Sequence, residues 1–249
     1  MTFSNYKFLV ASLAVISAAS LQTAQASSAY SATATYNFTI TATNTNLNSN
    51  DLSNLSIGST IDDFGYIINP TLNLSPVFTS SSSSSSSNLN DFTSFNTSYS
   101  QTFHSEDSIS SGSSSSEYLG TYIQTFQNNS FNAADVFEIT IDYTYDLTTS
   151  VSGENANTDL YFTMSNEFFD LDITDYASSS IAGNSSTSPG LVPGTFSFTL
   201  ENGEYDAIYA DSTLTGALEA VAPVPVPAAV WLFSSALITL SGMRKLKLS

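Results

Sequence analysis

The residues of this chain best suited to chemistry are carboxylates, and a group of three lies at residues 170–175. On a strand, Asp170 and Asp172 would share one face, and Asp175 would follow at the turn. Carboxylate oxygens grouped without a basic neighbour suit Ca²⁺, although the spacing is not that of an EF-hand loop. Asp170, Asp172 and Asp175 are therefore a candidate Ca²⁺ site. The alternative is an acidic strand edge that discourages aggregation.

His104 is the only histidine, and a Ser-His-Asp triad could be drawn around it because serine and aspartate are abundant. The chain has no Gly-x-Ser-x-Gly elbow, and the surrounding serine-rich sequence is a poor base for rigid geometry. Paired acids such as Glu138 and Asp142 alternate along the outer face of a strand, where solvated carboxylates are expected. We predict an exposed loop histidine, no catalytic residue and no enzyme.

The charges of the chain are divided between its ends and its middle. All four basic residues, Lys7, Arg244, Lys245 and Lys247, lie near the termini, whereas all 22 acidic residues lie between them. Without cations to replace counterions, the middle cannot bind nucleic acid through its phosphates. Cysteine is absent, which excludes disulfides and thiol chemistry. The fold must depend on apolar burial and hydrogen bonds.

The first residues have the pattern of a secretory signal peptide. Lys7 precedes an apolar run over residues 8–19, and Ala24 and Ala26 fit a small-x-small cleavage site. We therefore predict that residues 1–26 are removed on export. Residues 27–222 remain as one domain, long enough to bury a sizeable core.

Alternation of apolar and polar residues indicates strands throughout this domain. Residues 30–42 alternate cleanly, and residues 136–147 do so most strongly, since a slip of one residue there would bury three acids. The aromatic residues could stack on sugars, but most fall on apolar strand faces and are predicted to be core. Further strands are expected at residues 64–68, 118–126, 159–164, 168–173, 195–200, 205–210 and 213–221.

Turn and loop signals complete the prediction. The serine runs at residues 80–87 and 113–116 are low in complexity and are expected to be mobile, and residues 181–194 to form a loop. Asn202-Gly203 indicates a hairpin between residues 195–200 and 205–210. Short alternating strands without a βαβ rhythm predict an all-β fold, namely an antiparallel β-sandwich, with a jelly roll as a variant.

The end of the chain, residues 223–249, has three parts. Alternating prolines form an extended spacer. Residues 228–243 are uncharged and are predicted to form a short hydrophobic transmembrane helix. Arg244, Lys245 and Lys247 then form a basic tail, which the positive-inside rule keeps cytoplasmic. A plain C-terminal membrane anchor is the alternative interpretation. The residues at the entry of the helix are Val224, Pro225, Val226, Pro227, Ala228, Ala229, Val230, Trp231, Leu232 and Phe233.

This segment resembles the PEP-CTERM protein-sorting signal, in its V-P-x-P-A-A-x-W-L-F subtype. The glutamate usual in the family between the prolines is Val226 here. The resemblance implies export from a Gram-negative bacterium, transient anchoring in the inner membrane and processing by an exosortase-type enzyme. It also implies an association with exopolysaccharide and biofilm.

The sequence therefore leads to two expectations about function. The first is an exported, exosortase-processed structural protein of the cell surface or extracellular matrix. The second is a Ca²⁺-dependent carbohydrate-binding or adhesive module. No cofactor other than this Ca²⁺ is expected.

Overall fold

Long strands with alternating inward and outward side chains make up the computed structural model of the chain, which describes residues 27–46, 51–68, 76–86, 95–168, 170–181 and 185–221. The strands are β1 (Ser28–Asn44), β2 (Leu55–Ile67), β3 (Val77–Ser86), β4 (Phe95–Ile109), β5 (Gly112–Asn128), β6 (Phe137–Gly153), β7 (Asn155–Asn166), β8 (Asp172–Ser180), β9 (Ser185–Thr187), β10 (Gly190–Leu200) and β11 (Tyr205–Ala220). The predicted all-β class is confirmed.

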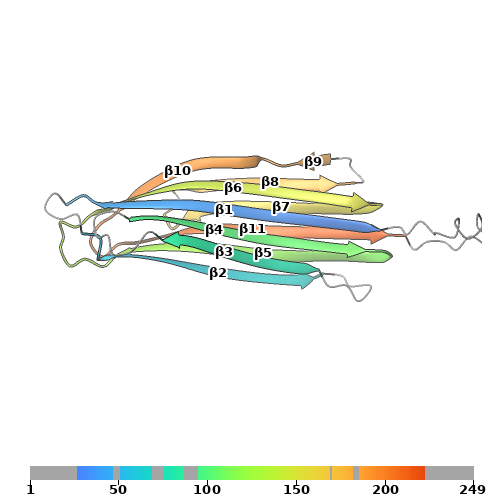
Figure 1. The fold of residues 1–249 in the computed structure, drawn as a ribbon, viewed down its shortest axis with the longest axis horizontal. Helices are drawn as coiled ribbons and strands as arrows, with labels where there is room; N and C mark the ends of the chain where they lie inside the picture. The colour runs from blue at the N-terminus through green and yellow to red at the C-terminus, as the bar shows by residue number, and fades with distance from the viewer. Residues whose placement is uncertain are drawn as a thin grey trace, which may run out of the picture. The chain divides into compact units, whose positions relative to one another are not determined.

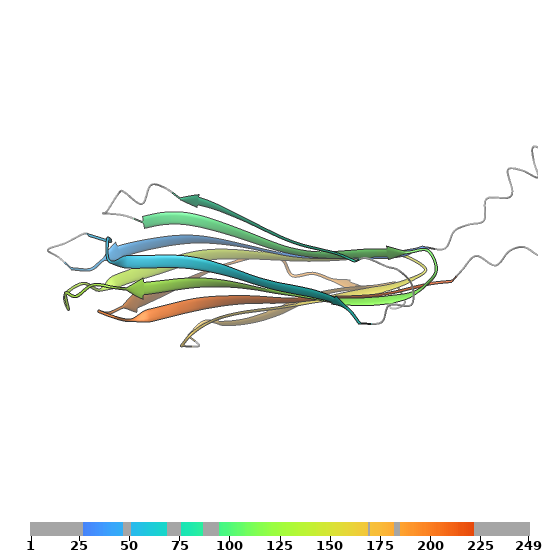
Figure 2. The same cartoon turned by 90° about the horizontal axis from the view of Figure 1, so that it is seen from below.

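The strands form two antiparallel sheets, drawn as two layers in Figure 2. The five-stranded sheet has the order β10-β6-β1-β4-β3, and the six-stranded sheet has the order β2-β5-β11-β7-β8-β9. Figure 1 shows that the axes of the strands are nearly aligned with one another. A strand of 17 residues such as β1 spans roughly 55 Å at about 3.4 Å per residue.

The core lies between the two sheets and is built from their inward-facing side chains. Tyr36 of β1 stacks on Phe162 of β7, with ring centroids 5.0 Å apart, and Phe38 of β1 stacks on Tyr122 of β5 at 5.4 Å. All four side chains are buried. Because each pair joins one sheet to the other, the sheets pack face to face as the predicted sandwich.

The two strongest strand predictions are confirmed, with longer strands than expected. β1 and β6 are direct neighbours, paired from Ser28 with Gly153 to Asn44 with Phe137. On β6, Phe137, Ile139 and Ile141 are buried, as the alternation indicated. The register therefore keeps the acidic residues of β6 off the inner face.

The serine runs are strands, which corrects the prediction of mobile segments. The first run lies in β3, which pairs with β4 from Val77 with Glu106 to Ser86 with Thr97. The second lies in β5, where Ser116 is buried and its hydroxyl hydrogen-bonds the phenol of Tyr30. Small hydroxyl side chains fit an inward position opposite a large tyrosine, so low complexity here does not mean disorder.

The hairpin predicted for residues 195–210 is wrong. The turn is present, with Gly203 at a φ of 78°, but β10 pairs with β6 in one sheet and β11 lies between β5 and β7 in the other. The chain crosses the core at this turn. Two amphipathic strands can bury their apolar faces by facing each other across a core, so a turn signal alone does not establish pairing.

The predictions for two shorter segments also need correction. Residues 168–173 were expected to form a strand, but β8 begins only at Asp172, and residues 167 and 168 belong to a turn. The loop expected at residues 181–194 contains β9 and the beginning of β10. Glycine and proline at residues 189–194 are tolerated because β10 is an edge strand.

The predicted signal peptide and the predicted C-terminal helix at residues 228–243 lie outside the described residues. Among the residues that are described, no helix is long and apolar enough to cross a membrane. Residues 27–221 form one compact unit.

Candidate functional site

The three aspartates of the predicted Ca²⁺ site are not brought together. Asp172 is exposed on the outer face of β8, whereas Asp175 faces inward, where its Oδ2 accepts a hydrogen bond of 3.0 Å from the Tyr145 hydroxyl. Burial and this contact raise the pKa of Tyr145 to about 12. Asp170 lies before the strand begins. No three histidine, aspartate or glutamate side chains are grouped for a metal ion within the described residues.

His104 lies on β4, not in the loop that we predicted. Its Nδ1 is 2.8 Å from the Thr33 hydroxyl, and its Nε2 is 3.4 Å from Glu106 Oε2. The side chains stand on the outer face of a sheet whose inner strands β1 and β4 have partners on both sides. Backbone N–H groups of these strands are used in the ladders, so this site has no oxyanion hole like that of a serine hydrolase.

A buried carboxylate, Asp135, organises the loops at one end of the sandwich. It accepts hydrogen bonds from Ser130 Oγ at 2.6 Å and from the side-chain amides of Asn46 at 2.9 Å and Asn44 at 3.3 Å. The bonds from Ser130 and Asn46 lower the pKa of Asp135. We call this end, with residues 129–136 and 201–204, the Asp135 end. The groups that donate these bonds to the Asp135 carboxylate are all neutral side chains of the protein, which favours a structural role for Asp135.

Asp206 is a second buried acid, at the beginning of β11. Its carboxylate accepts hydrogen bonds from the Asn166 side chain at 3.2 Å and from the backbone N–H groups of Ala207 at 2.7 Å and Glu167 at 3.2 Å. Burial nevertheless raises the pKa of Asp206. Glu167 in turn accepts a hydrogen bond from the Tyr209 hydroxyl at 2.8 Å, which raises the pKa of Tyr209 to about 12.

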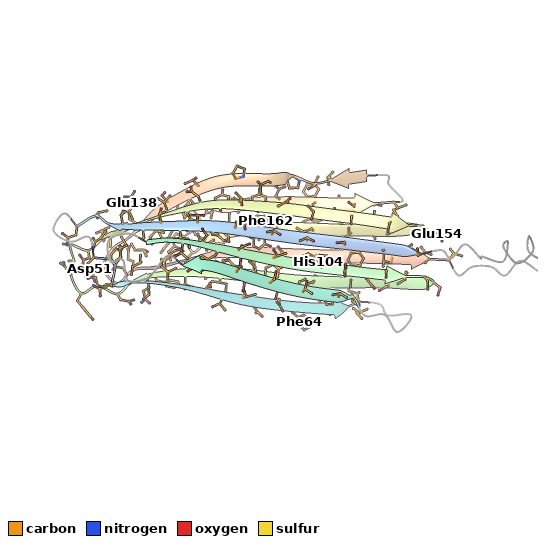
Figure 3. The ribbon with its side chains drawn as sticks, viewed as in Figure 1. Asp51, Phe64, His104, Glu138, Glu154 and Phe162 are labelled. Atoms are coloured by element: carbon orange, nitrogen blue, oxygen red, sulfur yellow. The ribbon has the colours of Figure 1, made fainter. Side chains whose placement is uncertain are left out.

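Four exposed apolar side chains and one threonine form a line across the outer face of the six-stranded sheet. Direct pairing joins Phe64 to Leu119, Leu119 to Thr213, Thr213 to Tyr161, and Tyr161 to Tyr176. The exposed fractions are 63% for Phe64, 39% for Leu119 and 56% for both tyrosines. Phe64 is labelled on β2 in Figure 3. We call these five residues the aromatic row.

Carboxylates border the aromatic row on both sides. One neighbouring row contains Glu117 and Asp159, and the other contains Asp62 and Asp211. Each neighbouring row lies two residues away along the strands, or about 6.8 Å. Asp211 accepts a hydrogen bond of 2.6 Å from the Thr121 hydroxyl. The row is therefore a largely apolar strip, five strands long, with carboxylates on both sides, and at β2 it widens to the exposed ring of Tyr66, 5.8 Å from that of Phe64.

Sequence reasoning missed the aromatic row because it placed most aromatic residues in the core. The signal was present in the alternation of β7, where Leu160 and Phe162 are buried and the intervening Tyr161 must face outward. The alignment of the row across five strands could not be read from the sequence, because it depends on the register of strands far apart in the chain.

The predicted sorting residues lie outside the described part of the chain, as do the cleavage-site residues Ala24 and Ala26. The same holds for Val224, Pro225, Val226, Pro227, Ala228, Ala229, Trp231, Leu232 and Phe233 and for the basic tail Arg244, Lys245 and Lys247.

Comparison with known proteins does not identify a family for this chain. No protein-family model matches the sequence, and no curated protein matches it. Among solved structures, one match is the secreted serine protease VesC from Vibrio cholerae, with 9% sequence identity and a TM-score of 0.09. The alignment covers 76% of this chain but 47% of that one, so the chain spans about half the length of the protease. Such a likeness carries no argument about fold or function.

Proposed function

We propose that this chain is an exported structural protein of a bacterial cell surface or extracellular matrix, without enzymatic activity. It is delivered by cleavage of its signal peptide, anchored transiently in the inner membrane by a helix at residues 228–243, and released by an exosortase-type enzyme. The segment at residues 223–249, with its proline spacer, apolar run and basic tail, supports this route of delivery.

The observation that carries the proposal is that the first strand of the sandwich, β1, begins beside the point where the last strand, β11, ends. The Ser28 hydroxyl donates a hydrogen bond of 2.7 Å to the backbone oxygen of Glu219, and accepts bonds from the N–H groups of Glu154 and Asn155. Figure 3 shows Glu154 at this end of the strands and Asp51 and Glu138 at the other. The two points at which the sandwich continues into the rest of the chain therefore lie at the same end of its strands.

The charge of the domain also suits a surface or matrix component. Every acidic residue of the chain lies between residues 27 and 222, and no lysine or arginine accompanies them. Such a polyanion stays soluble and repels its own copies. It has no cations with which to bind nucleic acid, and exopolysaccharide is the partner that the sorting signal implies.

The Ca²⁺-dependent adhesive alternative has less support. Asp172 and Asp175 project from opposite faces of β8, and Asp175 is already hydrogen-bonded to Tyr145. A shared ion would require these side chains to leave the positions that the strand imposes.

The test is the intact mass of the protein in membrane and extracellular fractions of its native host. We expect the extracellular form to begin at Ser27 and to end between residues 223 and 228, without Trp231 and the basic tail. A Pro225→Ala/Pro227→Ala variant should accumulate unprocessed, and Val221→Ala, just outside the motif, is the matched control. A full-length C-terminus retained in the inner membrane of the wild type would overturn the proposal.

A further inference from the structure

The aromatic row is an exposed, largely apolar strip bordered by carboxylates, and exposed apolar patches rimmed by polar residues mark binding surfaces. We infer that it binds a single chain of a neutral polysaccharide, with sugar rings stacked on Phe64, Tyr161 and Tyr176. This inference rests on the proposed function, whose polysaccharide partner it assigns to one face, but it does not depend on processing, because every residue of the row lies within the sandwich.

The ring-bearing positions have the dimensions of a linear polymer. Phe64 on β2 and Tyr176 on β8 are separated by four strand spacings, or about 19 Å at roughly 4.8 Å each. Across the row the strip is bordered by Glu117 on β5 and Asp159 on β7, and at β2 it widens to the ring of Tyr66, 5.8 Å from that of Phe64. A long, narrow ligand fits this strip, whereas a broad apolar protein face does not.

The bordering carboxylates select the chemistry of the ligand. Glu117, Asp159, Asp62 and Asp211 are hydrogen-bond acceptors, and the hydroxyl groups along the edges of a sugar chain are donors that can satisfy them. Glu117 already accepts a hydrogen bond from the Tyr66 hydroxyl on the same face. The stacked faces of sugar rings are apolar C–H surfaces, so one ligand meets both requirements of the site.

Charge argues against the other classes of occupant. An anionic polymer or a second copy of this chain would bring negative charge to a face whose charged neighbours are all carboxylates. A neutral protein surface wide enough for a stable interface would cover those carboxylates without pairing them, which is costly. A cationic protein would pair them and stack its cations on the rings, and loss of binding in 0.5 M NaCl distinguishes it from a neutral chain.

The twist of the sheet further restricts the class of ligand to a single soluble chain. Neighbouring strands in a sheet are rotated by roughly 20° relative to one another, so rings four strands apart are not coplanar. A flat crystalline polysaccharide surface cannot contact both ends of such a row. A single flexible chain can follow it.

The experiment is affinity electrophoresis of the full chain, purified in a detergent without a sugar headgroup. The gels contain hydroxyethylcellulose, mixed-linkage β-glucan, galactomannan or dextran as neutral probes, alginate as the anionic probe and chitosan as the cationic probe. We expect retardation by at least one neutral probe, unchanged in 0.5 M NaCl because the contact is not ionic, and no binding to alginate.

Variants test whether the row itself binds. Tyr161→Ala/Tyr176→Ala should weaken the retardation at least about tenfold, and Phe64→Ala should weaken it less. The matched control is Phe131→Ala, which removes a fully exposed aromatic ring at the Asp135 end and should change nothing. Circular dichroism confirms that each variant is folded, and Tyr161→Phe/Tyr176→Phe, which keeps both rings, should retain binding.

The inference is overturned if no neutral probe retards the wild type, or if the double alanine variant is retarded equally. Retardation by chitosan alone, abolished in 0.5 M NaCl, would instead indicate a cationic partner. Self-association that the double variant loses would indicate a second copy. None of these results would affect the intact-mass test of export and processing.

Discussion

Tyr36 of β1 stacks on Phe162 of β7 at the centre of the sandwich, with 5.0 Å between ring centroids and 28° between ring planes. The Tyr36 ring is fully buried, yet its hydroxyl has no hydrogen-bond partner within the described residues. Burial raises the pKa of Tyr36 well above its usual range. The ring thus stabilises the core, while the hydroxyl opposes burial.

Tyr36→Phe should therefore stabilise the protein. It keeps the stacked ring and removes an unsatisfied polar group. Removing that group should raise the free energy of unfolding by about 1 kcal/mol. Tyr36→Ala should destabilise by about 3–5 kcal/mol, because it leaves a cavity against Phe162. Urea titrations of the three proteins measure both changes. A destabilised Tyr36→Phe variant would show that the hydroxyl has a partner.

Asn128 should be required for stability although it is only one of many asparagines. Its buried side-chain amide donates to the backbone oxygens of Asp135 at 2.9 Å and Leu200 at 3.1 Å, and so joins β5, the loop before β6 and the end of β10. Asn128→Ala leaves these acceptors unpaired and should cost about 2–4 kcal/mol. Asn129→Ala, at the exposed neighbouring position, is the control and should cost below about 0.5 kcal/mol. Equal losses in the two variants would contradict this role.

Asp206 should make stability depend on pH. Because burial raises its pKa above the ordinary value of 3.8, the folded state holds a proton that the unfolded state releases in the window between the two values. The contribution of this carboxyl to the free energy of unfolding therefore falls as the pH rises through that window. Thermal unfolding of the wild type and of Asp206→Asn, followed from pH 3 to 7, should show the wild type losing stability relative to the variant. Parallel profiles would contradict the assignment.

Phe78 should hold the serine-rich strand β3 on the sheet. Its ring stacks on Tyr118 of β5, 5.2 Å away, and is the large apolar group that follows Val77 in a strand otherwise made of threonine and serine. Phe78→Ala should cost about 1–3 kcal/mol. It should also remove amide-exchange protection from β3 while leaving the β1–β6 ladder protected. Val77→Ala, at an exposed position, is the control. Protection of β3 that survives Phe78→Ala would show that the backbone ladder suffices.

Calcium should have little effect on stability. Asp172 and Asp175 face opposite sides of β8, so the strand gives Ca²⁺ no shared site. Dialysis of the full chain against EDTA, followed by return of Ca²⁺, should change the Tm by less than about 1 °C. A rise of several degrees that Asp172→Asn abolishes would restore the candidate site at Asp170, Asp172 and Asp175.

Alternation predicted the strands well wherever one face was apolar and the other was not. β1 and β6 have this pattern over their whole length, and their inward residues were identified correctly. It failed where the pattern was weak. The serines of β3 carry no apolar face of their own, and only pairing with β4 makes them a strand.

The same limit applies to the candidate sites. The carboxylates at residues 170–175 are close in sequence, but a strand sends alternate side chains to opposite faces, so Asp172 and Asp175 lie on opposite sides of β8. In contrast, Phe64 and Tyr176 are more than a hundred residues apart and belong to the same row. Closeness along the chain therefore indicated a metal site where the described residues form none.

By itself, the sequence determined the local properties of this protein: an all-β fold, the inward face of its strongest strands, a domain without cations and the pattern of its two ends. These follow from side-chain chemistry and from the two-residue period of a strand. Only the tertiary structure decided which strands pair, that β10 and β11 lie in different sheets, and that five outward side chains align across one face. Pairing and register depend on how distant segments share one core, because the free energy of burying apolar faces is gained only when two sheets meet.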